Sequence, residues 1–141
     1  MSKKGFTLIE LLAVIVIIGL ISLIAVPNML GISEDVRKEQ MLDDAKKLIS
    51  LAKMKINIDY EARNSNTPTT YTFTELNSDG GITTDPDGES YNSSSYVRYT
   101  KSGTDHYCIY LQSSKRHIGT SSECVSETNL YSKSNVKDND V

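Results

Sequence analysis

The sequence predicts an α+β protein, in which a long N-terminal helix packs against a small antiparallel sheet. Residues 11–26 are apolar except for Gly19 and Ser22, and further along the chain apolar residues return at the period of one helix face. Residues 96–100 and 106–112 are rich in tyrosine and β-branched residues and are separated by a turn sequence, as in a β-hairpin. Helix is therefore expected in the first half of the chain and strands in the second.

Length and charge limit the class of protein. The chain has 141 residues, enough for one domain of ordinary size and an appendage, and its formal net charge is −3. No basic patch is dense enough to indicate a protein that binds nucleic acid. From residue 27 onward the sequence is polar and rich in Ser, Thr, Asn, Asp and Tyr, so an apolar segment precedes a soluble head.

The apolar segment has the length of a membrane-spanning helix. At about 1.5 Å per residue, residues 6–26 would span roughly 30 Å, the thickness of the hydrocarbon core of a bilayer. Lys3 and Lys4 precede this segment, and positive charge there predicts a cytoplasmic N-terminus and an exterior head. A secretory signal peptide would be shorter and would end in an A-x-A site. A permanent anchor would leave Glu10 unexplained, because an acid in hydrocarbon costs about 2.5–3.5 kcal/mol.

Cleavage between Gly5 and Phe6 would account for more of this pattern, because it removes the basic leader and gives Phe6 a free amine. The stretch "KKGFTLIELLAVIVIIGLISLIAVP" resembles the N-terminal segment of type IV pilins and of the related pseudopilins. Those proteins have a short basic leader that ends in Gly, then Phe-Thr-Leu-x-Glu, then a long apolar run that reaches a Pro. The resemblance is close from residue 1 to about residue 30 and loose over residues 31–60.

The resemblance implies how the chain is processed and assembled. A prepilin peptidase would cut after Gly5 and N-methylate Phe6, and Glu10 would then meet the new ammonium group of a neighbouring subunit. At about 4 Å and an effective dielectric constant near 20, such a pair attracts by roughly 4 kcal/mol before desolvation. The implied partners are further copies of the chain, the peptidase, an inner-membrane assembly platform, and membrane lipid before assembly. A simpler explanation, an acid that snorkels to the interface, stays open.

Two residues are expected to interrupt the apolar helix of residues 6–30. Pro27 lacks an amide hydrogen and Gly19 is a poor helix former, so we expect a kinked helix that melts partly between them in a filament. A second helix, amphipathic and belonging to the head, is expected over residues 31–63, with Ser33 as its N-cap. We expect its apolar stripe to pack on the sheet rather than on a coiled-coil partner. The stripe consists of Leu42, Ala45, Ile49, Ala52 and Ile56.

The rest of the head, residues 64–130, is predicted to contain loops and the antiparallel sheet. "YTFTEL" (residues 71–76) is expected on the surface or in a brief helix, and "RHIGT" (116–120) is a candidate third strand. Ile109 and Leu111 are expected to face the helix.

Two cysteines and the two ends of the chain complete the predicted organisation. Cys108 and Cys124 both fall in the exterior head, where the environment is oxidising, so a disulfide is predicted in preference to two free thiols. Residues 1–5 would form the cleaved leader, and residues 131–141 a polar, frayed C-terminal tail.

Few side chains of the head suggest a ligand. Asp85 and Asp87 belong to an acidic cluster over residues 79–89 and are weak candidates for calcium ligands. An EF-hand loop centred on this cluster would need acids where Thr83 and Ser94 stand, so that motif is not satisfied. No metal or other cofactor is therefore predicted.

Catalytic motifs are also missing from the sequence. His106 and His117 are the two histidines, neither has the acids and cysteines of a metal site beside it, and no G-x-S-x-G motif occurs. We therefore do not expect an enzyme. Asn92 begins an N-x-S glycosylation sequon, a pattern that is common by chance.

The leading prediction is a structural subunit of an extracellular type IV pilus, which polymerises through its N-terminal helix and displays the head at the cell surface. Before assembly it would cross the cytoplasmic membrane once. The alternative is a pseudopilin of a type II secretion or competence (DNA-uptake) system. A third possibility is a monomeric, membrane-anchored binding module, which predicts no cleavage at Gly5.

Overall fold

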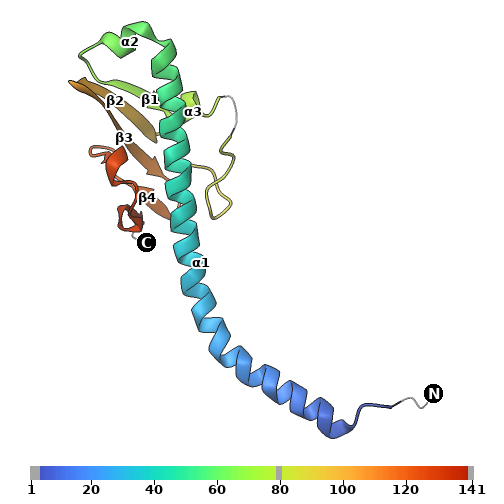
Figure 1. Cartoon of the computed structure of the whole chain (residues 1–141). Coiled ribbons are helices and arrows are strands. Elements are labelled where there is room, and N and C mark those ends of the chain that lie inside the picture. The colour runs from blue at the N-terminus through green and yellow to red at the C-terminus, as the bar shows by residue number, and fades with distance from the viewer. Residues whose placement is uncertain (1–3, 79–80, 140–141) are drawn as a thin grey trace. The chain divides into compact units, whose positions relative to one another are not determined.

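A computed structural model of the chain describes residues 4–78 and 81–139, and for residues 24–31 it describes the backbone only. The chain divides into two units, Met1–Val36 and Arg37–Val141. One helix, α1 (Leu8–Ile58), supplies all of the regular structure described in the first unit and continues into the second (Figure 1). The fold is α+β, as predicted, because six antiparallel strands among the described residues form a sheet in the second unit.

The N-terminal helix is long and continuous, as expected, but the predicted restart after Gly31 is wrong. The backbone of α1 is helical without interruption from Leu8 to Ile58, so the helix does not restart after residue 31 and Ser33 does not cap it. A proline inside a helix removes one backbone hydrogen bond. Every other residue of a long helix still adds its own bond once the helix is nucleated, so one missing bond does not have to end it.

The C-terminal end of the predicted amphipathic helix also differs, because Asp59 interrupts it. Asp59 has an extended backbone (φ −87°, ψ 94°), and its side chain accepts a hydrogen bond from the backbone N–H of Ala62. This cap starts a short helix, α2 (Tyr60–Asn64), which has Ser65 as its C-cap. Asp is a favoured N-cap because its short side chain reaches the free N–H groups of the first turn.

The predicted apolar stripe of α1 is confirmed as the face that packs on the sheet, and Figure 1 shows the sheet beside this part of the helix. All five predicted residues are at most 4% exposed, and Met41 and Leu48 are buried with them. From the sheet side, Ile109 and Leu111 are fully buried, as expected. Burial of this apolar surface is the main favourable term in the folding of the second unit.

The central hairpin is longer than predicted. It consists of β2 (Tyr96–Ser102) and β3 (Thr104–Gln112), which pair from Tyr96 opposite Tyr110 to Ser102 opposite Thr104. Only Gly103 lies between the strands, with φ at 76°. A glycine adopts this left-handed conformation without steric cost, and this is why the strands reach into the predicted five-residue turn.

Four shorter strands extend the sheet on both sides of the hairpin, in the order β1-β2-β3-β4-β6, with β5 paired to β3. Their bounds are β1 (Thr69–Thr72), β4 (Arg116–Ile118), β5 (Val125–Ser126) and β6 (Val136–Asp138). The candidate third strand is thus confirmed as β4. The first part of "YTFTEL" belongs to β1, which was not predicted, and the second part forms the brief helix α3 (Phe73–Leu76).

The prediction of a frayed C-terminal tail is wrong for the residues described. After two 3₁₀ turns, Glu127–Asn129 and Lys133–Asn135, strand β6 pairs with β4. Val136 is only 3% exposed, and the side chain of Asn139 donates to the backbone carbonyls of Ser113 and Ser114 at 2.9 Å. The tail is ordered because β6 pairs with backbone groups that β4 would otherwise leave unpaired along its edge. The buried side chain of Val136 anchors β6 in this position.

Candidate processing and assembly site

The predicted cleavage bond lies in an open segment ahead of α1. Residues 4–7 have no regular secondary structure, and a side chain placed on Gly5 would meet no atom within 4 Å. Phe6 is 86% exposed. A protease could therefore reach the bond between Gly5 and Phe6 without unfolding any described element.

Thr7 and Glu10 form a reciprocal cap at the start of α1. The Glu10 carboxylate accepts hydrogen bonds from the Thr7 backbone N–H at 2.9 Å and from the Thr7 hydroxyl at 3.0 Å. The Glu10 backbone N–H in turn approaches the Thr7 Oγ1 at 3.4 Å. This arrangement is a capping box, which satisfies free N–H groups of the first turn. The predicted assembly acid is therefore held against Thr7, two residues after the predicted cleavage position at Gly5.

The role of Thr7 was not predicted, although a local signal for it exists in the sequence. Thr followed three residues later by Glu, directly before an apolar run, is the sequence pattern of a capping box. The residues predicted for Glu10 to meet lie in a neighbouring subunit, whereas its closest described partner is Thr7 of its own chain.

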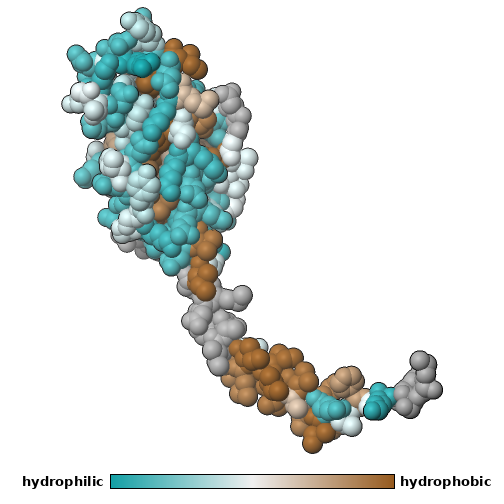
Figure 2. All heavy atoms as spheres, viewed as in Figure 1, coloured by the Kyte–Doolittle hydropathy of each residue, from teal (hydrophilic) through white to brown (hydrophobic). Residues whose placement is uncertain are grey.

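The first helical turns of α1 are apolar on all sides and exposed on all sides. Between residues 6 and 23, the large apolar side chains that are at least half exposed are Phe6, Leu8, Ile9, Leu11, Leu12, Val14, Ile15, Val16, Ile17, Ile18, Leu20, Ile21 and Leu23. Figure 2 shows the N-terminal part of α1 as largely hydrophobic on the face in view. A helix that is apolar all round belongs in an apolar environment, because soluble monomers rarely expose patches of this kind.

Within the part of the chain that is described, no helical stretch satisfies the length and apolarity needed to cross a bilayer. Gly19 lies within α1, and a Cβ added there would meet no atom within 4 Å. Pro27 lies in the helical backbone, but its side chain is outside the described residues.

The second unit contains the predicted disulfide, between Cys108 on β3 and Cys124. Their Cα atoms are 5.4 Å apart, and 16 positions separate them in the sequence. The bridge ties the segment before β5 to the hairpin. The hydroxyl of Tyr96 contacts the same segment by donating to the backbone carbonyl of Ser121 at 3.2 Å.

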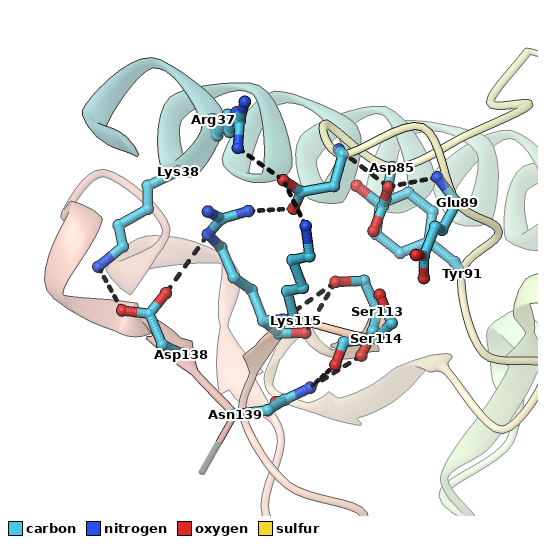
Figure 3. Close-up of polar contacts among 12 residues, drawn as sticks. Arg37, Lys38, Asp85, Glu89, Tyr91, Ser113, Ser114, Lys115, Asp138 and Asn139 are labelled. Atoms are coloured by element: carbon cyan, nitrogen blue, oxygen red, sulfur yellow. Dashed lines mark hydrogen bonds and ion pairs between the residues drawn. The ribbon is translucent and has the colours of Figure 1, made fainter. Parts of the chain in front are cut away.

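Asp87, a weak metal candidate, lies at the centre of an ion-pair network instead; its partners Arg37 and Lys115 are labelled in Figure 3. Its carboxylate is 2% exposed and pairs with the Arg37 guanidinium at 2.9 Å and with the Arg116 guanidinium in a closer contact. The Lys115 ammonium lies 3.8 Å away. The cations that balance this buried charge are therefore protein side chains.

Asp85, the other weak candidate, closes the turn that presents Asp87. Its Oδ1 accepts hydrogen bonds from the backbone N–H groups of Asp87 at 2.9 Å and of Glu89 at 2.8 Å (Figure 3). Asp79, another acid of the predicted cluster, lies outside the described residues. Among the residues that are described, no three His, Cys, Asp or Glu side chains are grouped in a way that could hold a metal ion.

Arg116 extends the network to the C-terminal strand. Its side chain is 4% exposed, and its Nε lies 3.3 Å from the Asp138 carboxylate, which also pairs with Lys38 at 3.1 Å. The network therefore joins α1, the loop before β2, β4 and β6. No local sequence signal marks it, because Arg37 and Arg116 are separated from Asp87 by 50 and 29 positions.

The remaining predicted polar residues have local partners. His106 contacts the Thr104 hydroxyl at 3.0 Å, and His117 contacts the Asn139 side chain at 2.7 Å. Asn92 lies in an exposed turn, where its side-chain oxygen accepts hydrogen bonds from the Ser94 N–H and hydroxyl, both at 2.9 Å. These contacts give each residue a structural role.

The long N-terminal helix and the small antiparallel sheet give the chain a pilin-like α+β fold. Residues 1–26 match the family model described as the prokaryotic N-terminal methylation motif. The chain is also similar to proteins named type II secretion system core protein G. It is 36% identical over 69 residues to that of Klebsiella michiganensis, 38% over 68 residues to that of Dickeya chrysanthemi, and 37% over 68 residues to that of Escherichia coli K12.

The matched stretches cover 49%, 48% and 48% of this chain and 45%, 41% and 43% of the three relatives. The chain therefore spans less than half of the length of these curated relatives. No solved structure matches the chain. The resemblance to the type IV pilin and pseudopilin family is confirmed by the N-terminal motif and by the names of these relatives.

Proposed function

We propose that the chain is a pseudopilin, the subunit of a short filament in a type II secretion or competence (DNA-uptake) system. The observation that carries this proposal is the exposed apolar surface of the first helical turns, where thirteen large side chains between residues 6 and 23 are at least half exposed. Such a surface needs an apolar environment. Membrane lipid would provide that environment for the precursor, and the corresponding helices of other copies would provide it in a filament.

The names of the relatives favour this function over the type IV pilus that the sequence had suggested first. Both kinds of filament use the same N-terminal motif, so the motif alone does not separate them. The similarity to core protein G of secretion systems extends over 69 residues, well beyond the motif, and it supports the secretion alternative.

In the proposed pathway a prepilin peptidase cuts after Gly5 and methylates Phe6. The exposed bond and the open surroundings of Gly5 support this step. The new ammonium group then pairs with Glu10 of a neighbouring copy. The position of Glu10 supports this pairing, because the capping box holds its carboxylate against Thr7, the residue next to Phe6.

The same proposal places the precursor in the cytoplasmic membrane as a single-pass protein with its N-terminus inside. An inner-membrane assembly platform would extract the processed chain into the filament. We assign the chain a structural role and no reaction of its own. The segments of the chain would then act as leader (residues 1–5), assembly helix (6–30) and displayed head, which begins at residue 31 and includes β6.

The mass of the mature N-terminus tests this function most directly. Filaments sheared from cells that express the chain should contain a polypeptide that begins at N-methylated Phe6, and electron microscopy should show short fibres. A mature chain that begins at Met1 would contradict the proposal, and long surface fibres would restore the type IV pilus.

A substitution tests the role of Glu10. Glu10→Gln keeps the shape of the side chain and should leave the protein in the membrane fraction with far fewer filaments. Glu61→Gln, which changes an acid on α2, is the matched control and should assemble normally. An unchanged filament yield for Glu10→Gln would show that the pairing is not needed.

A further inference from the structure

One asparagine of the head belongs to a glycosylation sequon that the proposed function does not use. Among the asparagines of the chain, only Asn92 has Ser or Thr two positions after it with a residue other than Pro between them, because Ser93 and Ser94 follow it. The motif alone is common by chance. Whether it can serve as an acceptor therefore depends on how the structure presents the side chain.

Asn92 lies in an exposed turn that the rest of the head holds in place. Residues 92–94 are exposed, whereas Tyr91 and Ser95 on either side of them are buried. The Ser95 N–H closes the turn by donating to the Asn92 carbonyl at 3.0 Å. The Asn92 N–H donates to the carbonyl of Gln112, the last residue of β3, at 2.8 Å. An anchored backbone therefore presents the side chains of residues 92–94 to solvent.

The amide nitrogen of Asn92 is available for a bond to a sugar. Within the described part of the chain, the side chain of Asn92 bonds through its oxygen, and its Nδ2 donates no hydrogen bond. The side-chain nitrogens of four other asparagines each donate to a backbone carbonyl: those of Asn64, Asn77, Asn135 and Asn139. A substituent on Nδ2 of Asn92 would therefore break no hydrogen bond of the fold.

The amide oxygen of Asn92 accepts hydrogen bonds that favour a reaction at this nitrogen. Its Oδ1 accepts from the Ser94 N–H and from the Ser94 hydroxyl, both at 2.9 Å. Hydrogen bonds to an oxygen stabilise negative charge on it, so they favour the loss of a proton from the attached amide nitrogen. The hydroxyl that the sequon requires thus lies against the group that would react.

We propose that Asn92 is glycosylated outside the cytoplasmic membrane by an oligosaccharyltransferase, with a lipid-linked oligosaccharide as the donor. In this step Nδ2 forms a bond to C1 of the first sugar, and the bond between C1 and a phosphate oxygen of the lipid carrier breaks. The phosphate leaves with the electron pair, and a base of the transferase takes the Nδ2 proton. The inference rests on the proposed function, because that function places the head outside the membrane, where the disulfide also forms.

Mass spectrometry of the chain purified from the cells that naturally express it tests the modification. Trypsin releases residues 64–98 as one peptide, since no Lys or Arg lies between Arg63 and Arg98. We expect at least half of this peptide to carry one or more sugar units, and fragmentation should place them on Asn92. The same peptide contains three asparagines without a sequon as internal controls, Asn64, Asn66 and Asn77.

Substitutions in the turn test whether the sequon directs the modification. Ser94→Ala should lower the glycosylated fraction at least tenfold, whereas Ser94→Thr should retain it, because threonine also supplies the hydroxyl. Ser93→Ala is the matched control, since Ser93 lies in the same exposed turn and its hydroxyl is not part of the sequon. The thermal midpoint of each variant should stay unchanged, because these side chains are exposed.

The outcomes separate the modification from the proposed function. A peptide without sugar, a sugar attached to a serine oxygen, or a glycosylated fraction that Ser94→Ala leaves unchanged would overturn the modification. A mature chain that begins at Phe6 and carries an unmodified Asn92 would leave the proposed function standing. A chain that begins at Met1 would overturn the proposed function, whether or not Asn92 is modified.

Discussion

Neutralising Asp87 should destabilise the second unit strongly. The carboxylate is 2% exposed and faces Arg116, whose side chain is 4% exposed. Asp87→Asn keeps the shape but leaves the Arg116 charge buried, and removing one partner of a buried ion pair costs about 3–5 kcal/mol. We expect the low end, about 3 kcal/mol, because Asp138 lies 3.3 Å from the other side of the guanidinium. For a unit of about 100 residues this corresponds to a decrease in Tm of roughly 12 °C.

Thermal unfolding of the full chain in detergent, followed by circular dichroism, measures this effect. Asp43→Asn is the matched control, because Asp43 is 66% exposed and pairs with Lys46 on the helix surface at 3.3 Å. An exposed pair contributes about 0–1 kcal/mol. Adding Arg116→Met to Asp87→Asn should recover part of the loss, since it removes the unpaired charge. If Asp87→Asn lowers Tm no more than Asp43→Asn does, the network does not hold the unit together.

Three further predictions concern the second unit. Replacing both Cys108 and Cys124 with Ser should lower the free energy of unfolding by about 3 kcal/mol, because the bridge closes a loop of 16 positions; reduction of the unmodified chain should give the same shift in denaturant titrations. Burial raises the pKa of Tyr107 to about 12. The stability contributed by its neutral hydroxyl should therefore be complete below about pH 10 and should be lost as the pH rises through about 12. Over the same pH range the Tyr107→Phe variant should lose less stability than the unmodified chain. Gly119→Ala should destabilise the unit by more than about 1 kcal/mol, since φ is 71° and the new Cβ would lie 2.8 Å from the Glu123 carbonyl oxygen. The control Gly81→Ala should change Tm little, because φ is ordinary there and no atom lies within 4 Å of the new Cβ.

The parts of the fold that could be predicted from sequence are those with a local period. The stripe from Leu42 to Ile56 repeats at the helical spacing, and the hairpin strands alternate around a glycine, so both patterns were sufficient for α1 and for β2 with β3. A new helix start after Gly31, with Ser33 as N-cap, was predicted from a local rule, but the backbone is helical from Leu8 to Ile58. Local rules for helix ends give a preference, which the length of the helix can override.

The parts that could not be predicted depend on partners far apart in the sequence. Strand β6 has a polar sequence, and only the free edge of β4 gives it a reason to be ordered. The cations around Asp87 include Arg37 on α1 and Arg116 on β4, which lie far from it in the sequence, so the sequence offered only a weak calcium interpretation for this acidic loop. At the N-terminus the sequence carries a clear processing motif. The contact between Thr7 and Glu10 follows from a different local pattern, Thr with Glu three residues later, which indicates a capping box.

The capping box at the start of α1 bears on how readily a fibre of this kind could come apart. An isolated copy already keeps the Glu10 oxygens hydrogen-bonded within its own first turn. Joining a neighbour would therefore exchange one set of bonds for another, so the polar pair would select the alignment of subunits without adding much adhesion. Cohesion would then come mainly from apolar contacts between helices, which need no directional bonds. Lipid offers a subunit at the base of the fibre a similar apolar environment, so the subunit could return to the membrane.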